Sequence, residues 1–359
     1  MTWCPFPFRS VMVKTDGHLT TCCYGKNIPG VHRDTHTIEQ AFNSPKFQQI
    51  RNNLSNGIQD SNCEKCWQLE KLGAESLRQQ EIRTEEYPAD ITENPRIEYL
   101  FLSLSNQCNL KCRTCSPTDS SFWIKEYEQV TGIKQLIYLE PDDSKFFSSF
   151  KNDTLPHLKE IAFTGGEPLM MKSVHRILET LDPSVSLTFY TNGTFYNPAM
   201  LEKFQDVNIA VSIDGIGSRF EYMRHPAKWN DVFRNLYKMD EHLKAITCTV
   251  SAYNVYYIDE VADFAKSLGV EFMAHLLFDP DNLSIMSIPK EVRPAIIDKL
   301  SKSNHPQLDK VIDYLKSDTE YSWDNFVKEV KLRDEYRGES FNSTFAEYNS
   351  VLRNYGKAI

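Results

Sequence analysis

The chain has 359 residues, 41% of them apolar and 25% charged, which is the composition of a globular protein and not of an intrinsically disordered one. The 49 acidic residues outnumber the 40 basic ones, and the net charge of −9 argues against a nucleic-acid surface, because binding to phosphates needs a basic one. No apolar run reaches the roughly 18 to 20 residues that span a bilayer, and the start of the chain has no secretory signal, so we expect a soluble cytoplasmic protein without membrane contact.

The first 85 residues are rich in loops and in cysteine. Gly17 suits a tight hairpin turn before the short apolar stretch that ends at Cys22. Ser44 and Pro45 predict a helix cap and first turn, followed by an apolar face that carries Phe47, Ile50 and Leu54. Prolines at 88 and 95 then mark a linker, which we place at 86–96.

From residue 97 onward, strand and helix patterns alternate. Ser173 and Asn230 are the predicted caps of two of the helices. Six short apolar stretches predict strands, at residues 96–105, 160–165, 185–193, 208–215, 245–254 and 270–278. Six β/α units in succession predict an α/β fold with a parallel sheet, open or curled into a partial (β/α)₆ TIM-like barrel, in which chemistry lies at the carboxyl ends of the strands.

These patterns divide the chain into four parts: a cysteine-rich domain at 1–85, the linker, a core at 97–280, and a C-terminal helical extension at 281–359. The extension is polar and amphipathic, and its acidic and aromatic helices have two interpretations: they cap the mouth of the barrel, or, by default, they form a solvated surface.

Eight of the nine cysteines lie in the first third of the chain, which in a protein without export signals indicates metal binding and not disulfides. Cys108, Cys112 and Cys115 form a CxxxCxxC triplet after the first strand of the core. Structural zinc requires four ligands, whereas a [4Fe–4S] cluster held by three cysteines keeps one iron open. Taken alone, the triplet leaves a cluster, zinc with a remote fourth ligand, and coincidence as alternatives.

Three further motifs follow at strand ends, and they are Gly165-Gly166-Glu167-Pro168, Thr191-Asn192-Gly193 and Ser212-Ile213-Asp214-Gly215. With the triplet, and in this order, they resemble the core of radical S-adenosylmethionine (SAM) enzymes over about 97–280. The resemblance implies that the cluster chelates SAM at its open iron. It further implies that reduction cleaves SAM to a 5′-deoxyadenosyl radical, which abstracts hydrogen from a substrate.

The same resemblance suggests residues for binding SAM. Adjacent glycines allow the backbone to approach a ligand where a Cβ would clash. The resemblance also implies a serine at the ribose and an arginine near the SAM carboxylate, and the candidate set is Gly165, Gly166, Glu167, Pro168, Asn192, Ser212, Asp214 and Arg224. Asn192 has the alternative of a simple turn residue, and Arg224 that of a solvated helix charge.

One position departs from the family pattern. The residue before the third cysteine of the triplet is usually aromatic and stacks near the adenine, and here it is Thr114, a role that Phe122 or Trp123 could take over. Asp279 and Asp281, just beyond the last strand, are candidate catalytic proton acceptors, and the alternative is that they only form a turn.

Cys4, Cys22, Cys63 and Cys66 make a closed set of four thiolates, and their spacing alone leaves zinc and an iron–sulfur cluster open. The order of CPFPF, DGxLTTC, a helix and CxxC resembles a twitch/SPASM auxiliary-cluster domain, here placed before the core. This implies a second [4Fe–4S] cluster that carries electrons. Because neighbouring strand residues point to opposite faces, only Cys22 or Cys23 can be a ligand, and the spacing favours Cys22. Cys23, like Cys248, is then expected to be a small buried hydrophobic residue.

The sequence therefore predicts a radical SAM oxidoreductase that oxidises or cross-links an unidentified substrate, with a peptide preferred because twitch/SPASM proteins often act on peptides. Dehydrogenation of a small molecule is one alternative, and a non-catalytic iron–sulfur or zinc binding protein is another. The expected partners are SAM and an external electron donor such as flavodoxin or ferredoxin.

Overall fold

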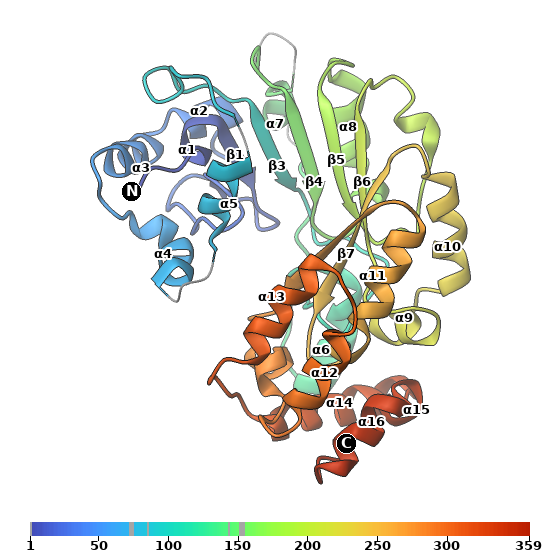
Figure 1. Ribbon diagram of the computed structural model, residues 1–359. Coiled ribbons are helices and arrows are strands. Elements are labelled where there is room, and N and C mark those ends of the chain that lie inside the picture. Colours follow the sequence, from blue (N-terminus) through green and yellow to red (C-terminus); the bar gives the residue numbers. More distant parts are fainter. Residues whose placement is uncertain (1, 72–74, 85, 143, 151–154) are drawn as a thin grey trace. The chain divides into compact units, whose positions relative to one another are not determined.

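The computed structural model describes residues 2–71, 75–84, 86–142, 144–150 and 155–359 (Figure 1). The chain forms two compact units. The first contains residues 1–109, 117–190 and 197–208, and the second contains residues 110–116, 191–196 and 209–359. The triplet loop is thus divided between them after Asn109.

The strands of the first unit are β1 (Ser10–Val13), β2 (Leu19–Thr20), β3 (Tyr99–Ser103), β4 (Glu160–Thr164) and β5 (Ser186–Thr191, whose last residue belongs to the second unit). β1 and β2 form the predicted hairpin, with Gly17 at a φ of 88° in the turn between them. β1 also pairs in parallel with β3, which pairs with β4, and β4 pairs with β5. The cysteine-rich segment therefore adds two strands to the sheet that the sequence predicts only from residue 97.

The helices of the first unit are α1 (Phe6–Arg9), α2 (Ile38–Phe42), α3 (Pro45–Ser55), α4 (Glu64–Lys71), α5 (Leu77–Thr84), α6 (Ile124–Thr131), α7 (Ser144–Ser148) and α8 (Lys172–Thr180). α3 begins as predicted, since the Ser44 hydroxyl accepts a hydrogen bond from the Phe47 amide at 3.4 Å. The predicted cap of α8 is wrong. Met171 is its N-cap residue, and Ser173 lies buried inside the first turn.

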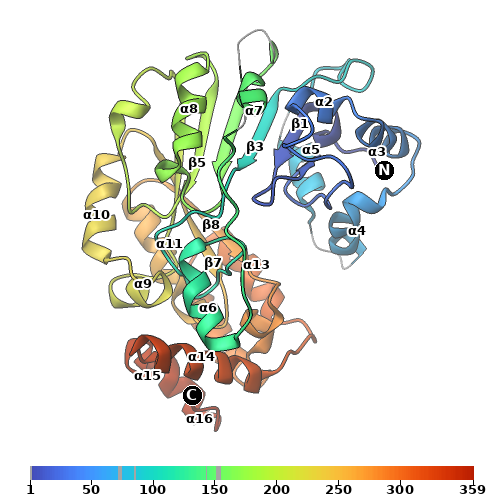
Figure 2. The same cartoon turned by 180° about the vertical axis from the view of Figure 1, so that it is seen from behind.

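The core of the first unit lies between the sheet and α8, which covers one face of β4 and β5 in both views (Figures 1 and 2). Phe163 of β4 and Phe189 of β5 stack with ring centroids 5.0 Å apart, and neither is exposed. α8 turns its buried side chains Val174, Ile177 and Leu178 inward, as its helical spacing predicts. This packing holds β4, whose carboxyl end leads into the Gly165-Gly166 motif.

The second unit contains most of β6 (Val207–Ser212), then β7 (Leu243–Val250) and β8 (Glu271–Leu276), which pair in parallel in this order. All six strands predicted from residue 97 onward are thus present. The helices of this unit are α9 (Ser218–Met223), α10 (Trp229–Lys238), α11 (Ile258–Ser267), α12 (Arg293–Leu300), α13 (Pro306–Leu315), α14 (Trp323–Arg337), α15 (Phe341–Thr344) and α16 (Ala346–Asn354). Lys228, not Asn230, is the N-cap residue of α10.

The C-terminal extension is helical as predicted, but its interpretation as a mainly solvated surface is wrong. Phe341 of α15 and Phe345 are at most 1% exposed, and each lies within 6.5 Å of the Tyr222 ring of α9. Phe326 of α14 packs against Tyr253 with ring centroids 4.9 Å apart. The extension therefore supplies an aromatic core to the second unit. No helix in the described ranges has both the length and the apolar character of a membrane span.

Candidate functional site

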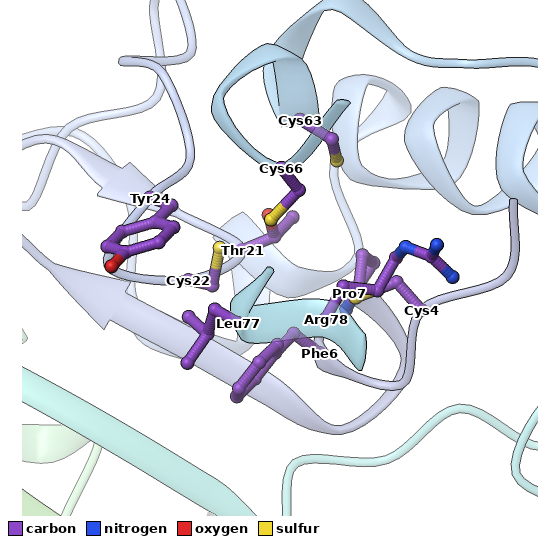
Figure 3. A pocket seen from close by; sticks show the side chains of 10 residues that line it. All are labelled: Cys4, Phe6, Pro7, Thr21, Cys22, Tyr24, Cys63, Cys66, Leu77 and Arg78. Carbon is purple, nitrogen blue, oxygen red and sulfur yellow. The ribbon is translucent and has the colours of Figure 1, made fainter. Parts of the chain in front are cut away.

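Four cysteines from the N-terminal segment line one pocket of the first unit, and Figure 3 shows them around it. Cys4 precedes α1, and Cys22 follows β2. Cys63 ends the 3₁₀ turn just before α4, and Cys66 lies in the first turn of α4. The hairpin and the helices thus bring together residues that are up to 62 positions apart, from Cys4 to Cys66.

The turn that carries Cys63 and Cys66 is fixed by Asp60. Its carboxylate accepts hydrogen bonds from the Asn62 amide at 2.8 Å and from Nδ2 of Asn53 at 2.7 Å. Its carbonyl oxygen accepts another from Nε1 of Trp67 at 2.9 Å. Asp60 therefore caps the turn that leads into α4. This turn brings Cys63 and Cys66, which are three residues apart, to the same side of the chain at the start of the helix.

Burial determines the chemistry of these thiols. Cys4 and Cys66 are each only 6% exposed, and burial raises the pKa of both thiols. Burial likewise raises the pKa of Cys22 to about 11. Such thiols stay protonated at neutral pH and become thiolates only when a metal replaces the proton, so metal binding here releases protons.

The donor set fits an iron–sulfur cluster. Of the residues that the structure describes, those that line the pocket offer four thiols and no carboxylate or imidazole, and soft thiolates are the ligands of such clusters. Among the described residues, no three His, Cys, Asp or Glu side chains are gathered closely enough to surround a single metal ion. The four thiols are spread around a shared pocket, and the cube of a [4Fe–4S] cluster carries four irons at separate corners, one for each thiol.

Cys23 lies apart from these four. Its side chain is exposed, so the expectation that it is a small buried residue is wrong, whereas Cys248 of β7 is completely buried. Cys23 lines a different cavity of the first unit, of about 360 Å³, with polar side chains that include Lys14, Asp16 and Asn27.

The first part of the triplet loop is held in the first unit by the backbone of the Gly165-Gly166 motif. The Gly166 amide donates to the Ser105 carbonyl at 3.1 Å, and the Glu167 amide donates to the Gln107 carbonyl at 2.8 Å. A Cβ on Gly166 would lie 2.0 Å from the Gln107 oxygen, so this close approach requires glycine. The motif after β4 is therefore bonded directly to the residues that precede Cys108.

Glu167 and Pro168 close this turn. Glu167 is completely buried, and its carboxylate accepts a hydrogen bond from the Leu169 amide at 3.1 Å, which caps the single 3₁₀ turn that begins at Pro168. Gly165, at a φ of 108°, borders the same polar cavity as Cys23.

Two aromatic residues were proposed to take the role of the aromatic residue that is absent at Thr114. Of these, Phe122 is 48% exposed and Trp123 is 3% exposed.

The second part of the loop belongs to the second unit. The Cys115 amide donates to the Cys112 carbonyl at 3.1 Å, which closes a tight turn. Nη1 of Arg224 lies 3.9 Å from Sγ of Cys112, and Nη2 of Arg224 pairs with the Asp214 carboxylate at 2.8 Å. Burial opposes ionisation of Arg224, but the charge of Asp214 outweighs it and keeps the pKa of the guanidinium above its ordinary value. Arg224 is thus a buried cation beside a triplet sulfur and not a solvated helix charge.

The remaining candidates occupy varied surroundings in the second unit. Oγ of Ser212 lies 3.2 Å from the Thr247 hydroxyl. The Asn192 side chain accepts hydrogen bonds from the amide and the hydroxyl of Thr194, which is the behaviour of a turn residue. Asp279 and Asp281 are exposed beyond β8.

Sequence reasoning missed one residue of this site. Arg113, between Cys112 and Cys115, is the largest side chain in the protein that is less than 2% exposed among the described residues, although a lone arginine in a loop gives no such signal. Its partners Asp334 and Glu339 lie 221 and 226 positions further along the chain.

Two family models match the chain. The radical SAM superfamily model matches residues 102–268, and the model of the SPASM iron–sulfur cluster-binding domain matches residues 4–67. The chain therefore contains a radical SAM domain and, before it, a SPASM domain. Its cofactors are [4Fe–4S] clusters and SAM.

The curated relatives are distant. Over 196 residues the chain is 27% identical to molybdenum cofactor biosynthesis protein 1 of Dictyostelium discoideum, and over 195 residues it is 28% identical to GTP 3′,8-cyclase of Desulforamulus reducens. These matches cover 50% and 52% of this chain but only 29% and 55% of the two relatives, so the chain spans about half of their length or less.

Solved structures that match this chain in part were also found. One is anSMEcpe with bound AdoMet, at a TM-score of 0.42 and 18% identity over 63% of each chain. Another is Streptococcus suis SuiB bound to the precursor peptide SuiA, at a TM-score of 0.39 and 13% identity over 85% of this chain and 68% of that one.

Proposed function

We propose that this protein cleaves SAM reductively to a 5′-deoxyadenosyl radical and uses it to oxidise or cross-link a peptide. In this proposal, Cys108, Cys112 and Cys115 hold a [4Fe–4S] cluster with one open iron. When bound, this cluster supplies the electron that cleaves the SAM sulfonium bond. An external flavodoxin or ferredoxin is the proposed electron donor.

One observation carries the oxidative part of this proposal. The four thiols that line the N-terminal pocket, Cys4, Cys22, Cys63 and Cys66, are enough to ligate every iron of a second cluster. A cluster without an open iron cannot bind a substrate directly, but it can accept an electron. An oxidised product requires that the substrate radical lose an electron, and this second cluster is suited to take it.

In this proposal, the residues named from the sequence for this role bind and orient SAM. The Gly165–Gly166 turn keeps the backbone close to the ligand, and Glu167, Pro168, Asn192 and Ser212 complete the proposed set. Arg224, held by Asp214, keeps a positive charge beside Cys112, where the SAM carboxylate is expected to bind. Asp279 and Asp281 remain the candidates for accepting the substrate proton, since their carboxylates are exposed.

The test is the anaerobic assay of 5′-deoxyadenosine formed from SAM and dithionite by the reconstituted protein. We expect product from the unaltered protein and none from Cys112→Ala, which should keep the iron of the N-terminal cluster. An assembled cluster that binds SAM and yields no 5′-deoxyadenosine would instead favour the binding-protein alternative.

A nucleotide substrate is the second candidate, because the curated relatives include GTP 3′,8-cyclases at 24–28% identity. The two candidates separate in two parallel competitions between a synthetic peptide mixture and GTP, in each of which only one of the two probes carries deuterium in place of carbon-bound hydrogen. We expect deuterium from the peptide mixture in 5′-deoxyadenosine and a peptide that has lost hydrogen. Deuterium transfer from GTP alone would exclude the peptide proposal.

A further inference from the structure

Arg113 connects the triplet loop to the rest of the second unit. Its side chain is completely buried, and it lies one residue after Cys112 and two before Cys115. The Arg113 amide donates to the Met223 carbonyl, at the end of α9, at 2.7 Å. The Lys111 amide donates to the backbone carbonyl of His225, two residues after Met223, at 2.8 Å. The backbone on both sides of Cys112 is therefore bonded to one segment.

The guanidinium of Arg113 reaches the C-terminal extension. Nη2 donates to Asp334 near the end of α14 at 2.7 Å and to Glu339 at 2.5 Å. The guanidinium carbon lies 3.9 Å from the centre of the Tyr222 ring, close enough for a cation–π contact. Nε and Nη1 are buried and have no hydrogen-bond partner in the described part of the chain, so the two carboxylates carry the electrostatic compensation of this cation.

Both carboxylates are themselves fixed in position. Asp334 accepts hydrogen bonds from the Tyr222 hydroxyl and from the Phe341 amide, each at 2.7 Å. Glu339 lies 2.6 Å from Nδ1 of His225. Partial burial opposes ionisation of Glu339, but the hydrogen bond from His225 and the charge of Arg113 lower its pKa, so it is an anion at neutral pH. The cluster loop, α9 and the extension are thus joined by one charged network.

We propose that Arg113 is a positioning residue for the triplet cluster, and that the C-terminal extension, through Asp334 and Glu339, sets both the shape of the Cys112–Cys115 turn and the charge beside it. This rests on the proposed function in taking these two cysteines as cluster ligands. One cation and two anions give the network a formal charge of −1, counting His225 as neutral. An anion beside a cluster disfavours its reduced form, and a cation favours it.

The test measures the reduction potential of the reconstituted protein by titration followed by electron paramagnetic resonance. The triplet cluster is identified as the one whose spectrum changes on addition of SAM. Glu339→Gln removes an anion and should shift its potential to a more positive value. Arg113→Gln removes the cation and should shift it to a more negative value. The double variant restores the net charge of the network, and its potential should return toward that of the unaltered protein.

Glu335→Gln is the matched control, because Glu335 is an exposed carboxylate near the end of α14, four residues before Glu339, and the reduction potential of the triplet cluster should not change in this variant. If Arg113 and Glu339 only stabilise the fold, the two single variants should shift the reduction potential of the triplet cluster in the same direction, or leave it unchanged. Either result overturns the proposal. If Arg113→Gln does not fold, the isosteric Glu339→Gln decides alone. A more positive potential, or loss of the triplet iron with the N-terminal iron retained, supports the proposal, and an unchanged potential overturns it.

Cys112→Ala separates this inference from the function on which it rests. If this variant keeps all of its iron, the proposed ligands are wrong and both proposals fall. If it loses the triplet iron while the charge variants keep the original potential, only the positioning role of Arg113 is overturned.

Discussion

At position 166 the structure leaves no room for a side chain. A Cβ there would lie 2.0 Å from the Gln107 oxygen and 2.8 Å from the Asn106 carbonyl carbon, and both are backbone atoms that cannot rotate away. Sequence reasoning predicted a close approach of the glycine motif to a ligand. The structure adds a close approach to the chain itself, immediately before Cys108, because the two segments follow neighbouring strands.

Gly166→Ala should therefore displace the residues that lead into the triplet. We expect a loss of about 1–3 kcal/mol in the free energy of unfolding, as for overpacking elsewhere, and a weaker spectral response of the cluster to SAM. Gly57→Ala is the control, because Gly57 has a φ of 77° but open space around it, so that only about 1 kcal/mol of backbone strain is expected. An unchanged SAM response in Gly166→Ala would show that the loop does not depend on this contact.

The N-terminal pocket gives a second prediction for single residues. Cys66→Ala should remove about half of the bound iron, because the protein then keeps only the triplet cluster. Cys23→Ala should keep the iron content, since this cysteine is exposed outside the pocket. Iron and sulfide analysis of the two reconstituted variants checks this, and equal losses in both would mean that the assignment of Cys22 over Cys23 is wrong.

At the scale of helices and strands, the elements predicted correctly are those with a local signal in the sequence. The six core strands are short apolar runs bounded by turn residues, and the hairpin around Gly17 and the start of α3 at Ser44 have local turn and cap residues. The caps of α8 and α10 were misplaced by two residues, because a serine or asparagine near a helix start fits several positions equally well. The pairing of β1 with β3 was missed, since parallel strands joined by a long connection leave no local pattern.

The extension was mistaken for a solvated surface for a related reason. Its apolar residues are separated by many charged ones, and α14 buries only Phe326, Val330 and Arg333. What it covers, the Tyr222 and Tyr253 rings, lies about 70 or more positions earlier in the chain, and no periodicity within the helix reveals such a partner. The Arg113 network could not be predicted from the sequence for the same reason, because its carboxylates lie 221 and 226 positions away from Arg113.

Phe341→Ala tests whether α15 is part of the core of the second unit. Phe341 is 1% exposed and lies against four other aromatic rings of this unit besides Tyr222, so the cavity should lower the free energy of unfolding by about 3–5 kcal/mol. Leu332→Ala, at a residue of α14 that is 40% exposed, should lower it by far less. Chemical denaturation of both holoproteins gives the comparison, and similar values would mean that the extension is only loosely packed.

At the scale of the whole molecule, the SPASM segment is both a cofactor domain and part of a sheet. Strand β1 pairs with β3, and Glu98 just before β3 is 2% exposed beside Arg9 and Arg96, with N–O distances of 3.6 and 3.2 Å. Its amide also donates to the Arg9 carbonyl at 2.9 Å. The four thiols of the pocket, by contrast, lie on short helices and loops and not on strands of the sheet. Ordering of this pocket should therefore depend on the metal, whereas β1 is held by the sheet.

Anaerobic removal of iron with a chelator should separate these two parts of the SPASM segment. Because a site of buried thiols contributes its metal-binding free energy to folding, we expect faster amide hydrogen exchange across residues 22–66 in the iron-free protein. Exchange in β3, β4 and β5 should stay slow, since these strands lie in a packed sheet. Cys66→Ala should show the same pattern without chelator, which distinguishes loss of the N-terminal cluster from loss of the triplet cluster. Unchanged protection of residues 22–66 in both cases would mean that this segment folds without its metal.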